Sequence, residues 1–205
     1  MKVVVASRNQ GKVAEYARMF NTLSWEVLSL DQAGIPPNFI LPEEGSTFEA
    51  NAYSKAAAVA PLLARDFALG DDSGLMVDAL GGAPGVFSAR YAGLGTTGAE
   101  QAHANIAKLL EALTGVPDQF RTARFVCQIV MIDGHGQRID SRGTCEGRIL
   151  RAPRGEGGFG YDPVFVPQGF DRSMAELTLD EKNRISHRGK ALLALMNKVS
   201  ARYGR

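Results

Sequence analysis

Cysteine is scarce in this sequence, and its scarcity excludes a class of protein. Cys127 and Cys145 are the only cysteines among 205 residues. Both lie in apolar, strand-like segments, and they match no C-x-x-C or zinc-ligand spacing. We therefore expect two buried thiols in a reducing compartment, and neither a disulfide scaffold nor a zinc site.

Net charge and long apolar runs are also lacking. Lysine and arginine total 23 against 22 aspartates and glutamates, a formal net charge of +1. A balance this even argues against a nucleic-acid coat or a membrane-surface protein. The longest apolar stretch, residues 56–64, is too short to span a bilayer, and Arg8 interrupts the N-terminal apolar run too early for a signal peptide. We expect a cytoplasmic protein with no membrane or nucleic-acid partner.

The residues that are present are typical of a globular protein, with 45% hydrophobic and 22% charged residues. We expect a single domain over residues 1–205. Hydrophobic periodicity predicts strands at 3–6, 25–30, 67–70, 124–132 and 137–150, and helices at 13–20, 47–65, 99–113 and after Thr178. Loops are expected at 34–45, 81–98 and 153–162, and a hairpin turn at 133–136. This order predicts an α/β fold with a mixed β-sheet flanked by helices.

The first candidate site is the turn between the first strand and the first helix, Ser7-x-Asn9-x-Gly11-Lys12. Free backbone N–H groups and the positive end of the helix dipole make such a turn an anion site, to which Lys12 adds a point charge. The spacing is not that of a P-loop. A capped turn with a solvated lysine fits the same residues equally well.

The second candidate is Asp71-Asp72-Ser73-Gly74, where the strand at 67–70 is expected to end. Successive strand residues point to opposite faces, so the two carboxylates should do different jobs. A carboxylate at this edge of a sheet can hold Mg²⁺ or deprotonate a water. The alternative for either aspartate alone is a side chain that only stabilises a turn.

A third candidate is the acidic pair Glu43-Glu44, which precedes the helix that carries Lys55. Acids near a helix N-terminus usually complement the helix dipole, and that interpretation is favoured for the segment alone. A second oxygen ligand for the same Mg²⁺ is the functional alternative.

Residues 155–160 fit G-x-G-x-x-G, but a dinucleotide site needs a strand before this motif and a helix after it. Pro163 and the β-type residues behind it make such a helix improbable, so we reject the dinucleotide interpretation. Phe159 instead suggests a platform on which a base could stack, with Tyr161 and Asp162 beside it.

A last cluster is cationic and lies where the final helix is expected to begin. Lys182, His187, Arg188 and Lys190 fall within nine residues. Cations are unfavourable at a helix N-terminus, so a nearby electronegative ligand would relieve their cost. Arg188 and His187 could donate hydrogen bonds to a carbonyl oxygen or a phosphate. A solvated cationic surface is the alternative.

In chain order, these segments resemble the inosine triphosphate pyrophosphatase family, which includes the bacterial dITP/XTP pyrophosphatases. The matching motifs are A-S-x-N-x-G-K at 6–12, E-x-G-x-T-F at 43–48, N-A-x-x-K-A at 51–56, D-D-S-G-L at 71–75, L-G-G-A-P-G-V-x-S-A-R-Y at 80–91, G-G-F-G-Y-D-P at 157–163, A-E-L at 175–177 and S-H-R at 186–188. Each motif is weak alone, but the combination is specific and runs nearly from end to end.

The resemblance implies an inosine triphosphatase-like (Maf-like) architecture with a cleft between two lobes, and a homodimer. It implies Mg²⁺-dependent hydrolysis of ITP, dITP and XTP to the monophosphate and pyrophosphate. The residues that match the family's functional positions are Ser7, Arg8, Asn9, Gln10, Gly11, Lys12 and Lys55 for the triphosphate, Glu43 and Asp72 for Mg²⁺, Asp72 as the base, Ser73 as a substrate contact, and Phe159, Gly160, Tyr161, Asp162, Lys182, His187 and Arg188 for the purine.

The sequence departs from the family pattern at two positions. Arg8 stands where a small residue such as glycine is frequent, which puts in doubt how closely the backbone there meets phosphate. Ala50 replaces an acid often seen before the Asn-Ala pair, and we expect no effect on chemistry.

Two other functions remain open. One is a Maf-like pyrophosphatase of pyrimidine nucleoside triphosphates, against which the motifs at 159–162 and 186–188 argue. The other is a nucleotide- or RNA-binding module without catalysis, which the near-neutral charge and the two acidic pairs disfavour.

Overall fold

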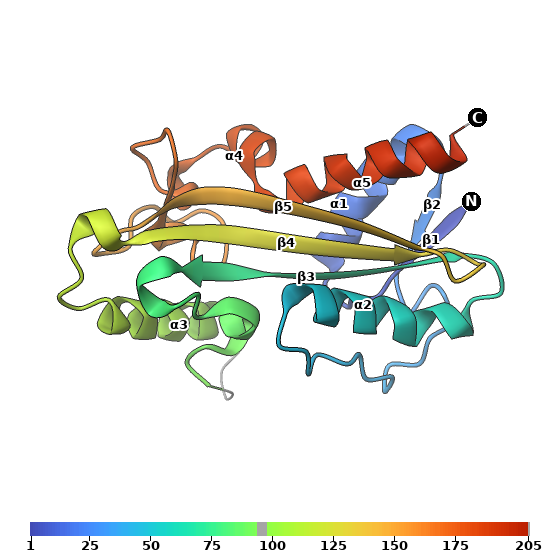
Figure 1. The fold of residues 1–205 in the computed structure, drawn as a ribbon, viewed down its shortest axis with the longest axis horizontal. Coiled ribbons are helices and arrows are strands. Elements are labelled where there is room, and N and C mark those ends of the chain that lie inside the picture. The colour runs from blue at the N-terminus through green and yellow to red at the C-terminus, as the bar shows by residue number, and fades with distance from the viewer. Residues whose placement is uncertain (94–97, 205) are drawn as a thin grey trace. The chain divides into compact units, whose positions relative to one another are not determined.

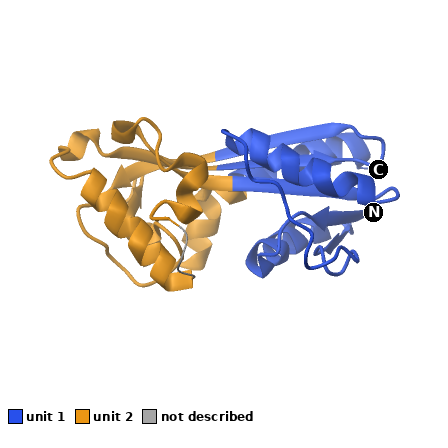
Figure 2. Cartoon of the chain, turned by 90° about the horizontal axis from the view of Figure 1, so that it is seen from below, with its two compact units in different colours: residues 1–72, 127–143, 190–205 blue, residues 73–126, 144–189 orange. Residues whose placement is uncertain are grey.

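A computed structural model describes residues 1–93 and 98–204. The chain forms two compact units (Figure 2), which interleave in sequence. Unit 1 comprises Met1–Asp72, Cys127–Gly143 and Lys190–Arg205, and unit 2 comprises Ser73–Val126 and Thr144–Gly189. The single domain over residues 1–205 stays a prediction.

Six strands form one mixed sheet in the order β2-β1-β3-β4-β5-β6 (Figure 1). The strands are β1 (Lys2–Val5), β2 (Glu26–Leu28), β3 (Phe67–Val77), β4 (Thr122–Ile132), β5 (Arg138–Ile149) and β6 (Phe165–Pro167). Strand β1 runs parallel to β2 and β3, and β6 runs antiparallel to β5. The predicted α/β fold with a mixed sheet is therefore confirmed.

The helices flank this sheet, as predicted. They are α1 (Gln10–Phe20), α2 (Phe48–Val59), α3 (Gly98–Ala112), α4 (Leu179–Ile185) and α5 (His187–Tyr203). The helix predicted at 47–65 ends earlier, at Val59, and a 3₁₀ turn that contains Pro61 follows it. Proline removes a helical hydrogen bond and explains the early end. None of the helices in the described residues is long and apolar enough to cross a bilayer.

The loop and turn predictions are largely correct. Residues 34–45 form no helix or strand, and Asp133 to Gln137 close a turn between β4 and β5. The loop predicted at 81–98 contains a 3₁₀ turn (Gly85–Arg90), and its residues 94–97 lie outside the described residues.

The strand predicted at 67–70 is longer than expected, and this is the main correction to the fold. Strand β3 continues through Asp71-Asp72-Ser73-Gly74 to Val77. Buried apolar residues, Leu69 before the motif and Leu75 after it, hold this strand in the two cores. The turn interpretation of the acidic pair is therefore wrong, because Asp71 and Asp72 lie within an extended strand.

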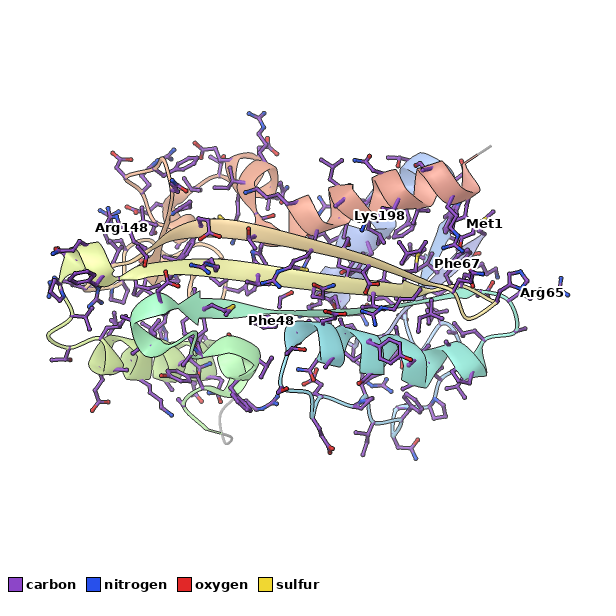
Figure 3. All side chains as sticks on the ribbon, in the orientation of Figure 1. Met1, Phe48, Arg65, Phe67, Arg148 and Lys198 are labelled. Atoms are coloured by element: carbon purple, nitrogen blue, oxygen red, sulfur yellow. The ribbon has the colours of Figure 1, made fainter. Side chains whose placement is uncertain are left out.

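Within unit 1, alternate residues of the strands pack on two opposite faces. Val3 and Val5 belong to the core cluster that contains α1 and α5, whereas Val4 belongs to a cluster with Val59 of α2. Figure 3 labels Phe48 in the first turn of α2 and Phe67 at the start of β3. Because successive strand side chains point to opposite faces, the sheet presents α1 and α2 on different sides.

Helix α2 approaches β3 most closely at Gly70. A Cβ atom at this position would lie 2.2 Å from the Ala52 carbonyl oxygen and 2.7 Å from the Ala56 backbone nitrogen. Both atoms belong to the backbone of α2, so they can move only if the helix moves. A glycine at position 70 therefore allows α2 to lie against the part of β3 that carries Asp71 and Asp72.

Gly70→Ala should lower the free energy of unfolding by about 1–3 kcal/mol, because the added methyl group overpacks the contact between helix and strand. Urea unfolding measures this. Gly34→Ala is the control, since a Cβ at Gly34 meets nothing within 4 Å and only the positive φ of +74° opposes it. A Gly70→Ala protein as stable as wild type would contradict the close packing of α2 on β3.

Candidate active site

The turn after β1 forms a capped helix N-terminus. Helix α1 begins at Gln10, and the side-chain oxygen of Asn9 accepts a hydrogen bond from the Lys12 backbone N–H at 3.2 Å. The Ser7 hydroxyl oxygen accepts one from the Asn9 backbone N–H, also at 3.2 Å. Gln10 and Gly11 are exposed in the first turn. The capped turn that was predicted as the alternative to an anion site is present. The cap still leaves the positive end of the helix dipole at the turn.

A purely structural turn predicts that the Lys12 side chain extends into solvent. The structure shows instead that this side chain is only 20% exposed. Its ammonium nitrogen lies 2.8 Å from Asp71 Oδ2, and the Asp71 side chain is only 1% exposed. A buried carboxylate requires a counter-ion, so this pair fixes Lys12 beside strand β3. The sequence placed Asp71 in the second candidate site without a role of its own, and the structure identifies it as the partner of Lys12.

Arg8 binds a different part of unit 1. Its guanidinium donates to Asp31 Oδ1 at 2.8 Å and to the Pro36 carbonyl oxygen at 2.7 Å. Arg8 thus attaches the segment that follows β2 to the turn. This is where the sequence departs from small residues at position 8, and the substrate-binding role of Arg8 stays a prediction.

The two aspartates of β3 have different partners, as the alternation of strand side chains predicted. Asp72 Oδ2 accepts a hydrogen bond from Asn51 Nδ2 at 2.9 Å, and Asp72 Oδ1 accepts one from Lys55 Nζ at 3.2 Å. Both donors lie on α2, one helical turn apart. Asp71 instead faces Lys12 of α1.

Lys55 is the buried centre of the acidic cluster. Its ammonium nitrogen lies 2.6 Å from Glu43 Oε1 and 3.2 Å from Asp72 Oδ1, and its side chain is 6% exposed. Burial alone would lower the pKa of Lys55, but the charge of Asp72 and the hydrogen bond to Glu43 outweigh it, so the pKa is raised. Lys55 is therefore charged at neutral pH.

A cavity of about 260 Å³ in unit 1 brings these groups to one place. Its lining includes Ser7, Arg8 and Lys12 from the turn and helix α1, Glu43 from the loop, Lys55 from α2 and Asp71 from β3. A cavity with two ammonium groups and a helix N-terminus at its wall is suited to a polyanion.

The carboxylates of this cluster could hold magnesium only together with further oxygen ligands, such as the phosphates of a substrate. Within residues 1–93 and 98–204, no group of three or more His, Cys, Asp or Glu side chains is arranged to hold a metal ion. Glu43 and Asp72, however, contact the same ammonium group and so lie close together. Mg²⁺ usually takes one or two carboxylates together with phosphates and waters, and this pair provides that number.

The residues predicted to bind a purine all lie in unit 2. Phe159 is 64% exposed, with the ammonium of Lys182 5.1 Å from the centre of its ring. Asp162 accepts a hydrogen bond from the Phe159 backbone N–H at 3.0 Å and forms an ion pair with Lys182. A Cβ at Gly158, whose φ is +80°, would lie 2.3 Å from Asp162 Oδ2, so this loop depends on glycine there.

Two of the predicted purine residues, Tyr161 and Asp162, are buried. Tyr161 is 4% exposed, and its hydroxyl donates to the Ser88 carbonyl oxygen at 2.9 Å. Burial raises the pKa of Tyr161, with a smaller contribution from Tyr91. Tyr161 is therefore buried next to the exposed Phe159, and its role in purine binding stays a prediction. His187 stacks on Phe125 with a ring separation of 5.0 Å.

The cationic cluster is divided between two helices. Lys182 lies in the last turn of α4, where a cation complements the helix dipole, whereas His187 and Arg188 open α5. Only the second group has the unfavourable position that the sequence predicted. The exposed loop at Gly160 lies in the same unit, as does Ser73, whose buried hydroxyl has no hydrogen-bond partner among the described residues.

Comparison with known proteins gives the class and then the family. The dITP/XTP pyrophosphatase of Desulforamulus reducens is 47% identical over 99% of this chain and 98% of its own length. The enzyme of the same name from Geobacillus kaustophilus is 51% identical over 95% and 92%. These relatives confirm the predicted class, the nucleoside triphosphate pyrophosphatases. Within it, the model of the Ham1 family matches residues 3–198, and the chain belongs to that family.

Solved structures agree with this assignment. The Staphylococcus aureus Ham1 protein has a TM-score of 0.88 and 39% identity, covering 98% of this chain and 99% of its own. A nucleoside-triphosphatase, or dITP/XTP pyrophosphatase, from Mycobacterium abscessus has a TM-score of 0.80 and 43% identity over 96% and 99%. The fold of this chain is therefore that of Ham1 proteins.

Proposed function

We propose that this chain hydrolyses dITP, ITP and XTP between the α and β phosphates, with Mg²⁺, to the nucleoside monophosphate and pyrophosphate. The names of the relatives support the purine substrates. One observation in this chain carries the proposal: Lys12 and Lys55 each hold carboxylates of unit 1 at the wall of the same cavity. Cations for phosphate and Glu43, one of the two proposed metal ligands, thus line one space, and the other ligand, Asp72, contacts Lys55 at its wall.

In this proposal the triphosphate binds at the N-terminus of α1, with Ser7, Asn9 and Gly11 in the turn and Lys12 and Lys55 as counter-charges. Phosphoryl transfer depends mainly on positioning and on neutralising charge, so such groups suffice to bind and orient the substrate. Mg²⁺, held by Glu43 and Asp72, would supply a Lewis acid that neutralises phosphate charge.

Asp72 is the proposed general base. Its two oxygens accept hydrogen bonds from Asn51 and Lys55, and each oxygen keeps a lone pair for a water. Asp72 would take one proton from that water as the water oxygen bonds to the α phosphorus. The bond between this phosphorus and the bridging oxygen then breaks, and pyrophosphate leaves with the electron pair.

The choice of base is proposed to rest on residues of unit 2, by resemblance to the family. Phe159 offers a stacking face, and Lys182, His187 and Arg188 offer donors. Hypoxanthine and xanthine present a carbonyl oxygen at position six, whereas adenine presents an amino group that would leave such donors unpaired. Sites of this kind can reject the wrong ligand by about 10⁴-fold.

A panel of nucleoside triphosphates with pyrophosphate detection tests the proposal. We expect kcat/KM for dITP, ITP and XTP to exceed that for ATP and dUTP by at least about 10²-fold. Preference for dUTP would favour the Maf-like alternative. Tight binding of dITP without release of pyrophosphate would favour a binding module and would overturn the proposal.

Three further properties stay predictions. We propose a homodimer, as the family resemblance implies, which light scattering on the purified protein would test. The absence of nucleic-acid partners and a cytoplasmic location rest on the sequence, and Cys127 and Cys145 are both buried and free, as a reducing compartment allows.

A further inference from the structure

One side chain connects the two segments that carry the acidic pair Glu43 and Asp72. Asn51, on α2, is 2% exposed. Its Oδ1 accepts a hydrogen bond from the Gly45 backbone N–H at 2.8 Å, and its Nδ2 donates to Asp72 Oδ2 at 2.9 Å. A single amide thus spans from the loop of Glu43 to strand β3.

We propose that Asn51 is a positioning residue that sets the orientation of Asp72 and the place of the Glu43 loop; this inference rests on the proposed function. The torsion that rotates an aspartate carboxylate is broad and has no strong intrinsic preference. Asn51 on one oxygen and Lys55 on the other define the plane of the Asp72 carboxylate. Asn51 acts through Asp72 and needs no contact with the substrate.

The chemistry of the two contacts explains why the residue is asparagine. Position 51 must present an acceptor to one N–H group and a donor to a carboxylate, and a carboxamide provides both on one planar group. Aspartate would keep the acceptor for Gly45 and lose the donor for Asp72. Alanine would lose both and leave the partly buried Gly45 N–H without its partner.

The packing at Gly45 shows that this contact is close on the loop side as well. A Cβ at Gly45 would lie 2.7 Å from Asn51 Oδ1 and 2.8 Å from the Ala50 Cβ. The loop therefore lies directly against the first turns of α2, two residues after Glu43. Fixing Gly45 fixes where the Glu43 side chain begins.

Asn51→Asp is the sharpest test, since it replaces the donor to Asp72 by a carboxylate with little change in volume. The added negative charge also repels Asp72, so Asn51→Ala, which adds no charge, should show the same fall in kcat. We expect kcat for dITP to fall by about 10²-fold, because a displacement near 1 Å of a reacting group has an effect of that size. KM for dITP should stay within about threefold, since the phosphate-binding groups on α1 are unchanged. A residue that mattered only for folding would not separate kcat from KM in this way.

Asn105→Asp is the matched control. Asn105 is also buried, at 5% exposure, and its amide accepts from the Ala92 backbone N–H at 2.8 Å and donates to the Ala89 carbonyl oxygen at 3.2 Å. It makes the same kinds of bond in unit 2, to backbone groups and to the Gln101 side chain, whose Nε2 donates to Asn105 Oδ1 at 3.0 Å. We expect Asn105→Asp to lower Tm and to keep kcat within about twofold of wild type.

A measurement independent of activity is thermal unfolding of Asn51→Ala, Asp72→Ala and the double variant. Residues in contact give non-additive effects, so the Tm loss of the double variant should be smaller than the two single losses combined. Additive losses, or a folded Asn51→Asp enzyme with kcat within threefold of wild type, would overturn the inference. A wild-type protein that does not turn over dITP would instead refute the proposed function, and the Tm comparison would still test the contact between Asn51 and Asp72.

Discussion

Asp72→Asn should lower kcat for dITP by about 10³-fold while the protein still binds the nucleotide. The change removes the proposed proton acceptor with almost no change in volume, and general-base catalysis contributes about 10²–10⁴-fold. In the wild type, the two oxygens of Asp72 accept hydrogen bonds from Asn51 and Lys55. The asparagine of the variant has an NH₂ group in place of one oxygen, so one of these hydrogen bonds is lost. Initial rates of pyrophosphate release and calorimetric binding of dITP in EDTA measure the two effects.

Asp78→Asn is the control for Asp72→Asn. Asp78 is a partly exposed acid of unit 2 that pairs with Arg124 at 2.9 Å, and exposed pairs contribute little to stability. We expect its kcat to remain within twofold of wild type. An Asp72→Asn enzyme with full activity would refute the role of Asp72 as the base.

Lys55→Met should have the second large effect, on both activity and stability. The change leaves the carboxylates of Glu43 and Asp72 without the ammonium group that lies between them. Glu43 is 47% exposed, but Asp72 is only 14% exposed and loses one of its two hydrogen-bond donors, so we expect the free energy of unfolding to fall by about 1–3 kcal/mol. We also expect kcat/KM for dITP to fall by at least about 10²-fold, because a cation that neutralises phosphate charge is lost.

The pH dependence of this loss has a definite sign. The folded state raises the pKa of Lys55 above its ordinary value of 10.5, so the stabilisation by Lys55 is complete below that pH and is lost as pH rises through the higher folded pKa. Between pH 6 and 9, roughly, the deficit of Lys55→Met should therefore be constant.

Urea unfolding of Lys55→Met and wild type at several pH values measures this deficit. Lys198→Met, which removes an exposed lysine that donates to the Asp140 carbonyl oxygen, is the control and should change stability by less than about 0.5 kcal/mol. A Lys55→Met protein as stable as this control would show that the folded state does not need Lys55 to balance the charges of Glu43 and Asp72.

The fold could be predicted from the sequence where periodicity was strong and uninterrupted. Val3 and Val5 of β1 and the apolar stripe of α1 are buried in one core, and Val4 is buried on the opposite face of the sheet. The course of β3 could not be predicted, because Asp71, Asp72, Ser73 and Gly74 are individually typical of turns. What keeps them extended is tertiary: Lys12 balances Asp71, and Lys55 with Asn51 balances Asp72.

The candidate site was predictable in its charges and less so in its connections. The spacing of motifs identified Lys12, Glu43, Lys55 and Asp72, and the structure groups Lys55 with both acids. The contacts of Asn51 were missed, although its spacing of four residues from Lys55 puts the two on one face of a helix. The burial of Tyr161 could not be predicted, since a sequence does not show whether an aromatic residue of a glycine-rich loop turns inward.

The products of dITP turnover test the central claim most directly. The enzyme is incubated with dITP and Mg²⁺, or with dITP and EDTA, and the phosphorus species are identified by ³¹P NMR. The account predicts pyrophosphate and dIMP in equal amounts with Mg²⁺ and no turnover with EDTA. Release of orthophosphate with dIDP, or the same rate in EDTA, would contradict it.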